Sequence, residues 1–129
     1  MLVRGILNPH ISSLLARIRH TNTLVIADRG FPFWPGLETI DLSLVDGVPT
    51  VPQVLDAVLF NWTAGRVFMA EEFCAVNSQE TQQRFADALR GTPRSFEPHS
   101  QFKLRVPRAV GLIRTGETTQ YANMILESA

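Results

Sequence analysis

Short apolar segments alternate with segments of helical period along this chain, and this alternation is the feature that most constrains its fold. Strands are predicted at Thr23–Ala27 (TLVIA), Arg66–Ala70 (RVFMA), Ala109–Arg114 (AVGLIR) and Asn123–Glu127 (NMILE), with a weaker one at Thr39–Leu44. Strands this short and apolar are typical of a buried sheet, and the intervening helices can cover both of its faces. We therefore expect an α/β fold, a single three-layer domain with a central mixed, mostly parallel sheet flanked by helices.

Two of the expected helices begin at clear capping residues. Asn8 followed by Pro9 places a cap and then a proline at the first helical position, so a helix is predicted that ends near residues 19–20. Thr50 with Gln53 three residues later resembles a capping box, in which each side chain satisfies a backbone N–H of the other residue. The apolar residues that follow Gln53 predict a mostly buried helix.

Two further helices have weaker signals. Asn77 with Glu80 predicts the cap of a helix that runs to about Arg90, and residues 99–105 are expected to form a short helix. Phe31–Gly36 (FPFWPG) holds two prolines and a glycine and is predicted to be a loop. No repeat, low-complexity tract or linker divides the chain, so residues 1–129 are expected to form one domain.

Composition and charge argue against several classes of protein. Apolar residues make up 45% of the 129 residues and charged residues 19%, a balance typical of a globular domain. Twelve basic and twelve acidic residues leave no net charge, so no overall field attracts nucleic acid or a membrane surface, and self-association is permitted. Motifs for nucleotide phosphates, zinc proteases and serine hydrolases are absent from the sequence.

A single cysteine and the lack of targeting patterns predict a cytoplasmic protein. Cys74 can form no internal disulfide and cannot build a zinc site by itself, and its apolar neighbours predict a small buried group. The first ten residues lack the uninterrupted apolar core of a signal peptide. No stretch approaches the roughly 18 apolar residues that a membrane span needs.

Titratable residues stand at both ends of the first predicted strand. Asp28 follows the strand directly, where a carboxylate can accept sugar hydroxyls or orient a base, or serve as an ordinary turn residue. His20 precedes the strand, and a histidine ordinarily titrates near neutral pH, which suits a general acid or base. A histidine at a helix end also satisfies the last carbonyl groups, so by position alone the structural role is favoured for both residues.

Polar and aromatic residues elsewhere form a second group of candidates. Tyr121 and Asn123 alternate along the entry to the last strand, so their side chains can point to one face and bind a neutral, hydroxyl-rich ligand. The same residues are equally typical of a hairpin loop whose tyrosine packs against the fold and binds no ligand. His99 precedes the short helix and is either a surface residue or a site residue. Phe33 and Trp34 suit the apolar face of a sugar and a subunit contact equally.

Four motifs in a fixed order make the chain similar to a known family. They are His-Thr-x-Thr at residues 20–23, Asp-x-Gly-x-Pro at 28–32, His-x-Gln-Phe-Lys at 99–103, and Gly-Glu with Tyr-Ala-Asn at 116–123. No single motif is specific, but the ordered set extends over nearly the whole chain. It resembles the RbsD/FucU family of sugar mutarotases and is most similar to the ribose-type branch of that family.

This resemblance implies roles for particular residues. His20 corresponds by position to the catalytic proton donor of the family. The residues implied to bind the sugar are Asp28, His99, Lys103, Tyr121, Ala122 and Asn123. Among these Lys103 has the weakest support, while His99 and Ala122 favour the ribose-like over the fucose-like branch. No metal site and no cofactor are implied.

Four positions depart from the family pattern. Arg19, Asn22, Arg29 and Gln120 stand where the family more often has glycine, aspartate, alanine and proline. The two arginines bring fixed positive charges close in sequence to His20 and Asp28, which would suit an anionic sugar.

The activity implied by the resemblance is a cofactor-independent interconversion of the cyclic forms of a monosaccharide, pyranose with furanose, anomers, or both. An acid protonates the ring oxygen while a base removes the hemiacetal proton, and the ring opens and recloses. The sequence does not assign the proton acceptor. The alternatives are a mutarotase for L-fucose or another sugar, and a non-catalytic sugar-binding protein that serves a transporter.

The distance between His20 and Asp28 constrains how such a site is built. Strand residues rise about 3.3 Å each, so the five strand residues 23–27, which lie between His20 and Asp28, span roughly 15 Å. One sugar cannot reach both side chains unless residues 20–22 fold back or a neighbouring subunit supplies one of the two. The family forms ring-shaped homo-oligomers, decamers of two pentamers with sites at subunit contacts, and the resemblance therefore implies a site built from two chains.

Overall fold

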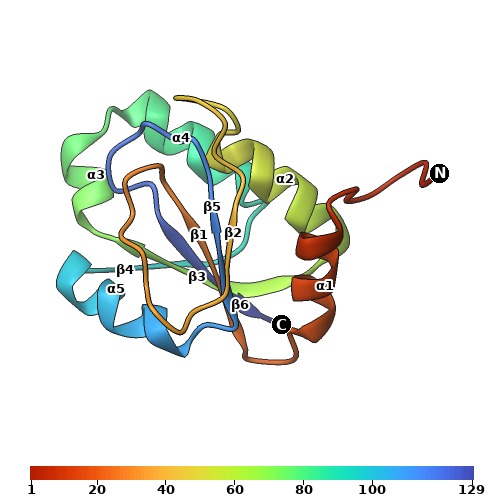
Figure 1. Cartoon of the computed structure of the whole chain (residues 1–129). Coiled ribbons are helices and arrows are strands. Elements are labelled where there is room, and N and C mark those ends of the chain that lie inside the picture. The colour runs from red at the N-terminus through yellow and green to blue at the C-terminus, as the bar shows by residue number, and fades with distance from the viewer.

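A six-stranded mixed sheet forms the centre of the computed structural model, which describes all residues from 1 to 129 (Figure 1). The strands are β1 (Thr23–Ala27), β2 (Thr39–Asp41), β3 (Ala64–Ala70), β4 (Arg94–Glu97), β5 (Gly111–Arg114) and β6 (Met124–Ser128). Their order across the sheet is β2-β5-β1-β6-β3-β4. Only β6 runs antiparallel to its two neighbours, and the other three pairs are parallel, which confirms the predicted mixed, mostly parallel sheet.

Helices cover both faces of this sheet, as predicted. They are α1 (Pro9–Arg17), α2 (Val51–Asn61), α3 (Glu72–Val76), α4 (Gln79–Ala88) and α5 (His99–Arg105), which continues into the 3₁₀ turn η1 (Val106–Arg108). In Figure 1, α2 and α4 lie above the strands and α5 lies below them. None of the helices is both long and apolar enough to cross a lipid bilayer.

Each face of the sheet has its own apolar core. Leu24 and Ile26 of β1 pack into a cluster of 18 buried residues with α1, α2, α3 and α4. Val25 and Ala27 point the other way, into a cluster of eight buried residues that includes Phe102 of α5. The strict alternation along β1 follows from the two-residue period of a strand. β1 is therefore buried from Leu24 to Ala27, which fixes the positions of the residues at its two ends.

The capping predictions are confirmed for two helices. The Asn8 side chain accepts hydrogen bonds from the N–H groups of His10 and Ile11, at 2.9 and 3.1 Å, and α1 follows. The Thr50–Gln53 capping box is present at the start of α2. Helix α1 ends at Arg17, slightly before the predicted end, because Ile18 takes an extended conformation and is buried in the core.

Two local predictions are wrong. Ser78, not Asn77, caps α4, because the Asn77 amide instead donates to the carbonyl oxygens of Phe73 and Gln120 at 2.8 and 2.9 Å. The bond to Phe73 closes α3, a short helix that the sequence did not predict, and the bond to Gln120 joins it to the loop before β6. Cys74 is exposed rather than buried, since α3 turns its neighbour Phe73 into the core.

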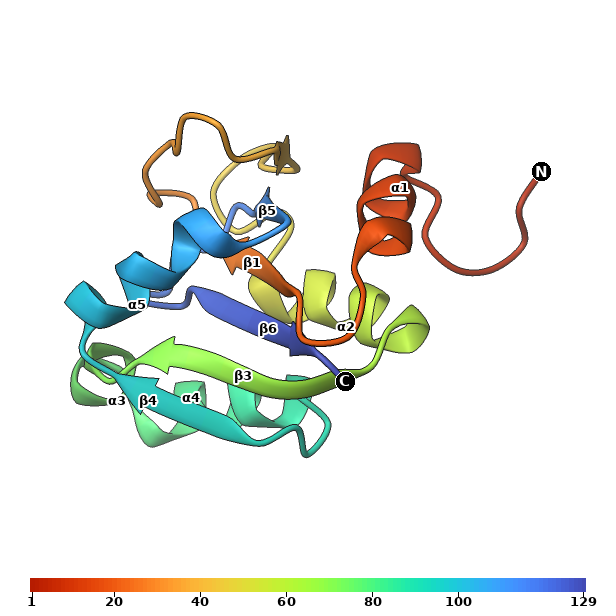
Figure 2. The same cartoon turned by 90° about the horizontal axis from the view of Figure 1, so that it is seen from below.

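The connection between β5 and β6 is a crossover, not a hairpin. β1 lies between these two strands, parallel to β5 and antiparallel to β6. The end of β5 and the start of β6 therefore both lie at the carboxyl end of β1, and residues 115–123 pass across that end. The chain end lies at the opposite side, where Thr21 donates to the Ser128 carbonyl at 3.1 Å beside the α1–β1 turn (Figure 2).

Candidate functional site

Asp28 and Asn123 form a double hydrogen bond at the carboxyl end of β1. The Asp28 N–H donates to Asn123 Oδ1 at 2.7 Å, and Asn123 Nδ2 donates to Asp28 Oδ2 at 3.1 Å. The other carboxylate oxygen, Asp28 Oδ1, accepts the Gly30 N–H at 3.0 Å. Asn123 itself is only 4% exposed. Both carboxylate oxygens are thus held in place, and each keeps a lone pair for a ligand.

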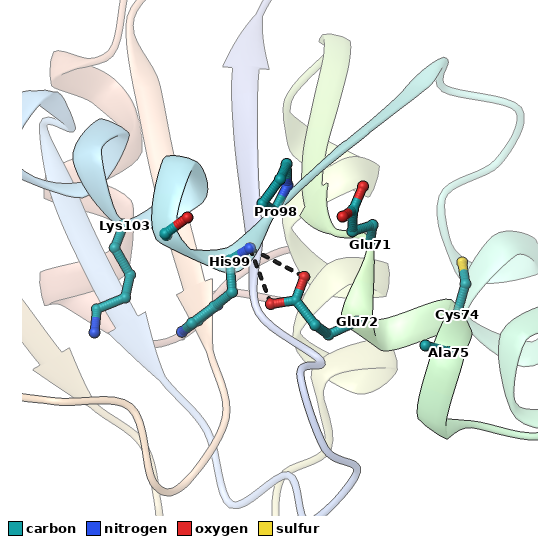
Figure 3. A pocket seen from close by; sticks show the side chains of 8 residues that line it. Glu71, Glu72, Cys74, Ala75, Pro98, His99 and Lys103 are labelled. Atoms are coloured by element: carbon teal, nitrogen blue, oxygen red, sulfur yellow. Dashed lines mark hydrogen bonds between the residues drawn. The ribbon is translucent and has the colours of Figure 1, made fainter.

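His99 begins α5 and is fixed from both its backbone and its ring. Its N–H donates to both carboxylate oxygens of Glu72, at 3.1 and 3.0 Å (Figure 3). Its ring stacks on Phe102, with centroids 5.8 Å apart, and meets the Tyr121 ring edge-on at 5.2 Å. Nδ1 is buried without a hydrogen-bond partner, so Nε2 is the ring nitrogen that can meet a ligand.

Tyr121 has a backbone conformation that is rare for its residue type. Its φ angle is +55°, in the left-handed region that side chains other than glycine seldom adopt. Such a conformation persists only where surrounding contacts fix it, and it is common at ligand sites. Here it places the phenol ring against His99 and leaves Asn123, two residues later, against Asp28.

These four side chains line one hollow of about 290 Å³. The residues that complete its wall are Gly30, Phe31, Pro32 and Gln120. The volume is at the small end of the range for ligand sites in proteins. One carboxylate, one imidazole, one phenol and one amide converge on it, a set that can bind several hydroxyl groups of a small neutral molecule.

The Asp28 carboxyl is tuned by its surroundings. Partial burial raises the pKa of Asp28 above its ordinary value, because desolvation disfavours the charged form. Hydrogen bonds from Gly30, Asn123 and Phe31 and the nearby His99 oppose this rise and lower the same pKa. The net shift is upward, which brings the carboxyl closer to the pH range in which it can exchange a proton during a reaction.

A larger, open depression of about 880 Å³ adjoins the hollow and shares His99 with it. Figure 3 shows Glu71, Glu72 and Cys74 on one side of this depression and Lys103 on the other. Lys103 lies one helical turn after His99 and extends to the same side of α5 (Figure 3). The depression lacks Asp28, Tyr121 and Asn123, so the smaller hollow is the candidate for the sugar.

Three of the residues proposed from the sequence do not reach the hollow with their side chains. His20 is exposed in the turn before β1, at the strand's opposite end from Asp28. Lys103 lines only the adjoining depression. Ala122 is fully buried in the core, so it can offer a ligand only its backbone.

The aromatic loop after β1 is built for packing. Trp34 stacks on Phe31 with ring centroids 6.4 Å apart and packs against the cluster of Phe102 and its neighbours. Phe33 is exposed and does not line the hollow. Arg114 binds the Phe31 carbonyl at 2.7 Å and so fixes this loop to the end of β5. Phe31, not Phe33 or Trp34, is therefore the aromatic residue of this loop that lines the hollow.

Arg29 does not add free charge to the site. Its guanidinium pairs with the Asp46 carboxylate at 2.8 Å, in the turn that follows β2. Arg29 is also absent from the wall of the hollow. The sequence-based expectation that Arg29 favours an anionic sugar is therefore not supported by this arrangement.

Sequence reasoning did not connect Glu72 with His99. The two residues are 27 positions apart, and no local pattern links them. They meet because β3 and β4 are parallel with Ala70 opposite Glu97, so each residue stands two positions beyond that pair. Knowledge of the strand register is the only signal that could have found the contact.

A sequence profile of the RbsD / FucU transport protein family matches residues 1–129. This chain belongs to that family. The D-ribose pyranase of Geobacillus kaustophilus (strain HTA426) is 44% identical over 124 residues, which are 96% of this chain and 90% of the relative. The D-ribose pyranase of Chromobacterium violaceum is 42% identical over 130 residues, 99% of this chain and 97% of the relative.

Solved structures of the family have the same fold. Bacillus subtilis RbsD complexed with D-ribose superposes with a TM-score of 0.92 at 36% identity and covers 100% of this chain and 98% of its own. The fucose mutarotase of Streptococcus pneumoniae in complex with L-fucose has a TM-score of 0.83 at 20% identity. The match covers 99% of this chain and 98% of the mutarotase chain. The structure with D-ribose bound and the structure with L-fucose bound therefore share this fold.

Proposed function

We propose that this protein is a cofactor-independent isomerase that interconverts the pyranose and furanose forms of D-ribose. The observation that carries this proposal is the hollow of Asp28, His99, Tyr121 and Asn123 in a chain 36% identical, over its full length, to a structure with D-ribose bound. The D-ribose pyranases at 44 and 42% identity support the same activity.

The polar groups of the hollow bind the hydroxyls of the sugar. Asp28 accepts hydrogen bonds from one or two hydroxyls, because both of its oxygens keep free lone pairs. His99 Nε2 and the Tyr121 hydroxyl exchange further hydrogen bonds with the sugar, and the Phe31 ring lies against its C–H groups. In this proposal Lys103 belongs to the outer part of the site, and the buried Ala122 contributes only its backbone.

His20 supplies the acid from a neighbouring copy of the chain. Within one chain His20 lies at the amino end of β1 and Asp28 at its carboxyl end, so they cannot meet on one sugar. A second copy that presents its α1–β1 turn to the hollow completes the site. The assembly proposed for this protein is a homo-oligomer with sites at subunit contacts, a decamer of two pentameric rings, in the cytoplasm.

Asp28 is the proton acceptor that the sequence left open. Its carboxylate removes the proton from the hemiacetal hydroxyl, the bond between the anomeric carbon and the ring oxygen breaks, and His20 protonates that oxygen. The open-chain aldehyde then rotates and is attacked by a different hydroxyl. The new hydroxyl's proton returns to His20 and the Asp28 proton returns to the carbonyl oxygen, so both groups regain their starting states.

No cofactor takes part in this sequence of steps. Ring opening also proceeds slowly in water, and a positioned acid and base contribute about 10²–10⁴-fold each in typical enzymes. The raised pKa of Asp28 favours its role, since a stronger base accepts the proton more readily than an ordinary aspartate does.

Saturation-transfer NMR with D-ribose tests the function directly. We expect the wild-type protein to accelerate exchange between pyranose and furanose signals, and His20→Ala to abolish the acceleration while the fold is kept. Acceleration with L-fucose but not D-ribose would identify a mutarotase for a different sugar. Binding without acceleration for every sugar tried would identify a sugar-binding protein and would overturn the isomerase.

A further inference from the structure

Glu117 is the only charged residue of the chain that is buried, with 4% of its surface exposed. It lies in the loop between β5 and β6, four residues before Tyr121. None of the six ion pairs includes it. A carboxylate removed from water without a positive partner must be satisfied by hydrogen bonds, so its contacts show what the residue holds together.

Three backbone N–H groups replace water around the Glu117 side chain. The Val51 N–H donates to Oε1 at 3.1 Å, and the N–H groups of Thr118 and Thr119 donate to Oε2 at 3.1 and 3.2 Å. Val51 is the first residue of α2, an eleven-residue helix whose N-terminal partial positive charge favours a carboxylate. The side chain therefore ties the start of the loop to the start of a core helix.

The backbone of Glu117 binds the residue that follows Asp28. The Arg29 N–H donates to the Glu117 carbonyl at 3.1 Å. The Glu117 N–H donates to Thr115 Oγ1 at 3.1 Å, and that hydroxyl donates to the Ala27 carbonyl at 2.8 Å. The loop is thus hydrogen-bonded to the residue before Asp28, Ala27, and to the residue after it, Arg29.

Tyr121 and Asn123 are the part of the loop that faces the sugar. Tyr121 has its unusual φ of +55°, and Asn123 forms two hydrogen bonds with Asp28. Both arrangements require the loop to leave β5 along one path. Glu117 fixes that path at its beginning, through contacts that involve no sugar-binding side chain.

We propose that Glu117 is a positioning residue of the sugar site. By fixing the 115–123 loop to α2 and to the end of β1, it places Tyr121 and Asn123 opposite Asp28 before any sugar binds. The role of the site is that given under Proposed function, and this inference rests on it. Glu117 touches no part of the hollow itself.

Glu117→Gln is the direct test. A carboxylate has two acceptor oxygens for these three N–H donors, whereas a glutamine amide has one oxygen and turns an N–H₂ toward donors. We expect affinity for D-ribose to fall about tenfold, the effect of one lost buried hydrogen bond, while the turnover of bound sugar changes less than about threefold. In the sugar-free protein, the amide NMR signals of Tyr121 and Asn123 should shift or broaden.

Thr50→Ala is the matched control. It removes the cap of the same helix, since Thr50 Oγ1 accepts the Gln53 N–H at 3.2 Å, but it leaves the Glu117 contacts in place. The control should lower thermal stability without moving the Tyr121 and Asn123 signals or the affinity for D-ribose. If Glu117→Gln behaves in the same way as this control, Glu117 stabilises the fold only and the proposal is wrong.

Two features keep this test separate from that of the proposed function. The amide signals are measured without sugar, so an inactive wild-type protein leaves this readout intact. If the Glu117→Gln variant does not fold, the inference is tested instead by amide hydrogen exchange in the wild-type protein. Binding of D-ribose, or of L-fucose if ribose does not bind, should slow exchange at Thr118 and Thr119, and unchanged exchange would overturn the inference.

Discussion

Asp28 and Asn123 are 95 residues apart in the sequence and bind each other through two hydrogen bonds, one from the Asp28 backbone at 2.7 Å and one to its carboxylate at 3.1 Å. The amide of Asn123 thereby fixes the orientation of the carboxylate from one side, while the Gly30 N–H fixes it from the other. Each carboxylate oxygen thus has a hydrogen-bond donor within the chain. Asp28, the base in the proposed function, is therefore held in one orientation at the wall of the hollow.

Asn123→Ala should weaken both the fold and the site. It removes both partners of Asp28 on that side, which costs about 1–3 kcal/mol of unfolding free energy for the unsatisfied groups. Affinity for D-ribose should fall as well, because the carboxylate is no longer oriented. Thermal unfolding and a sugar titration measure the two effects. An affinity equal to that of wild type would show that Asn123 is a structural residue only.

Asp28→Asn separates a proton acceptor from a simple anchor. If Asp28 is the base, the rate of ring opening should fall about 10²–10⁴-fold while bound sugar remains detectable. A pure anchor would lose affinity and keep its rate at saturating sugar. Exchange NMR over a series of ribose concentrations gives both quantities. Asp46→Asn removes an exposed carboxylate outside the hollow and serves as the control.

The raised pKa of Asp28 predicts opposite pH dependences for stability and activity. Because its folded-state pKa lies above the unfolded value, this carboxyl contributes stability that is fully present below the unfolded pKa and is lost as the pH rises through the folded pKa. Catalysis needs the ionised form, so activity should fall as the pH drops through the same folded pKa. Denaturant unfolding of wild type and Asp28→Asn at a series of pH values measures the effect on stability. Exchange NMR over the same pH values measures the effect on activity. If stability and activity change only at or below pH 3.8, the ordinary pKa of an aspartate, both predictions are contradicted.

Mixed oligomers test whether two chains build one site. His20→Ala and Asp28→Asn should each be inactive alone. After unfolding and refolding together, a site that takes His20 from one chain and Asp28 from its neighbour regains both groups in about a quarter of random combinations. Recovery of about a quarter of wild-type activity is expected. No recovery, with mixing verified by a mass tag, would place both groups in the same chain.

Arg29→Ala should have little effect, although Arg29 follows Asp28 directly. The guanidinium is exposed and pairs with Asp46, and exposed ion pairs of this kind contribute about 0–1 kcal/mol to stability. Affinity for D-ribose should change less than about threefold. A large gain or loss of affinity, or a new affinity for a phosphorylated sugar, would show that Arg29 reaches the ligand.

Local chemistry made much of the fold predictable. The β1 segment is apolar at every one of its middle positions, and Asn8 and Thr50 are strong helix caps, so these elements could be located without tertiary information. Where two capping residues were adjacent, local chemistry was not sufficient. Asn77 and Ser78 can both cap a helix, and the contact with the distant Gln120 decided which one does.

The sequence by itself determined that His20 and Asp28 stand at opposite ends of a buried strand, because strand length is a local property of the segment TLVIA, four of whose five residues are apolar. It also held the ordered motifs by which the candidate residues could be named. Only the tertiary structure decided that Asn123 reaches Asp28 and that Glu72 holds His99. It also decided that Glu117 anchors the 115–123 loop to α2. These contacts depend on strand order and register, with β1 inserted between β5 and β6 and β3 in parallel with β4. That order is set by the packing of the whole chain, so no local stretch of sequence specifies it.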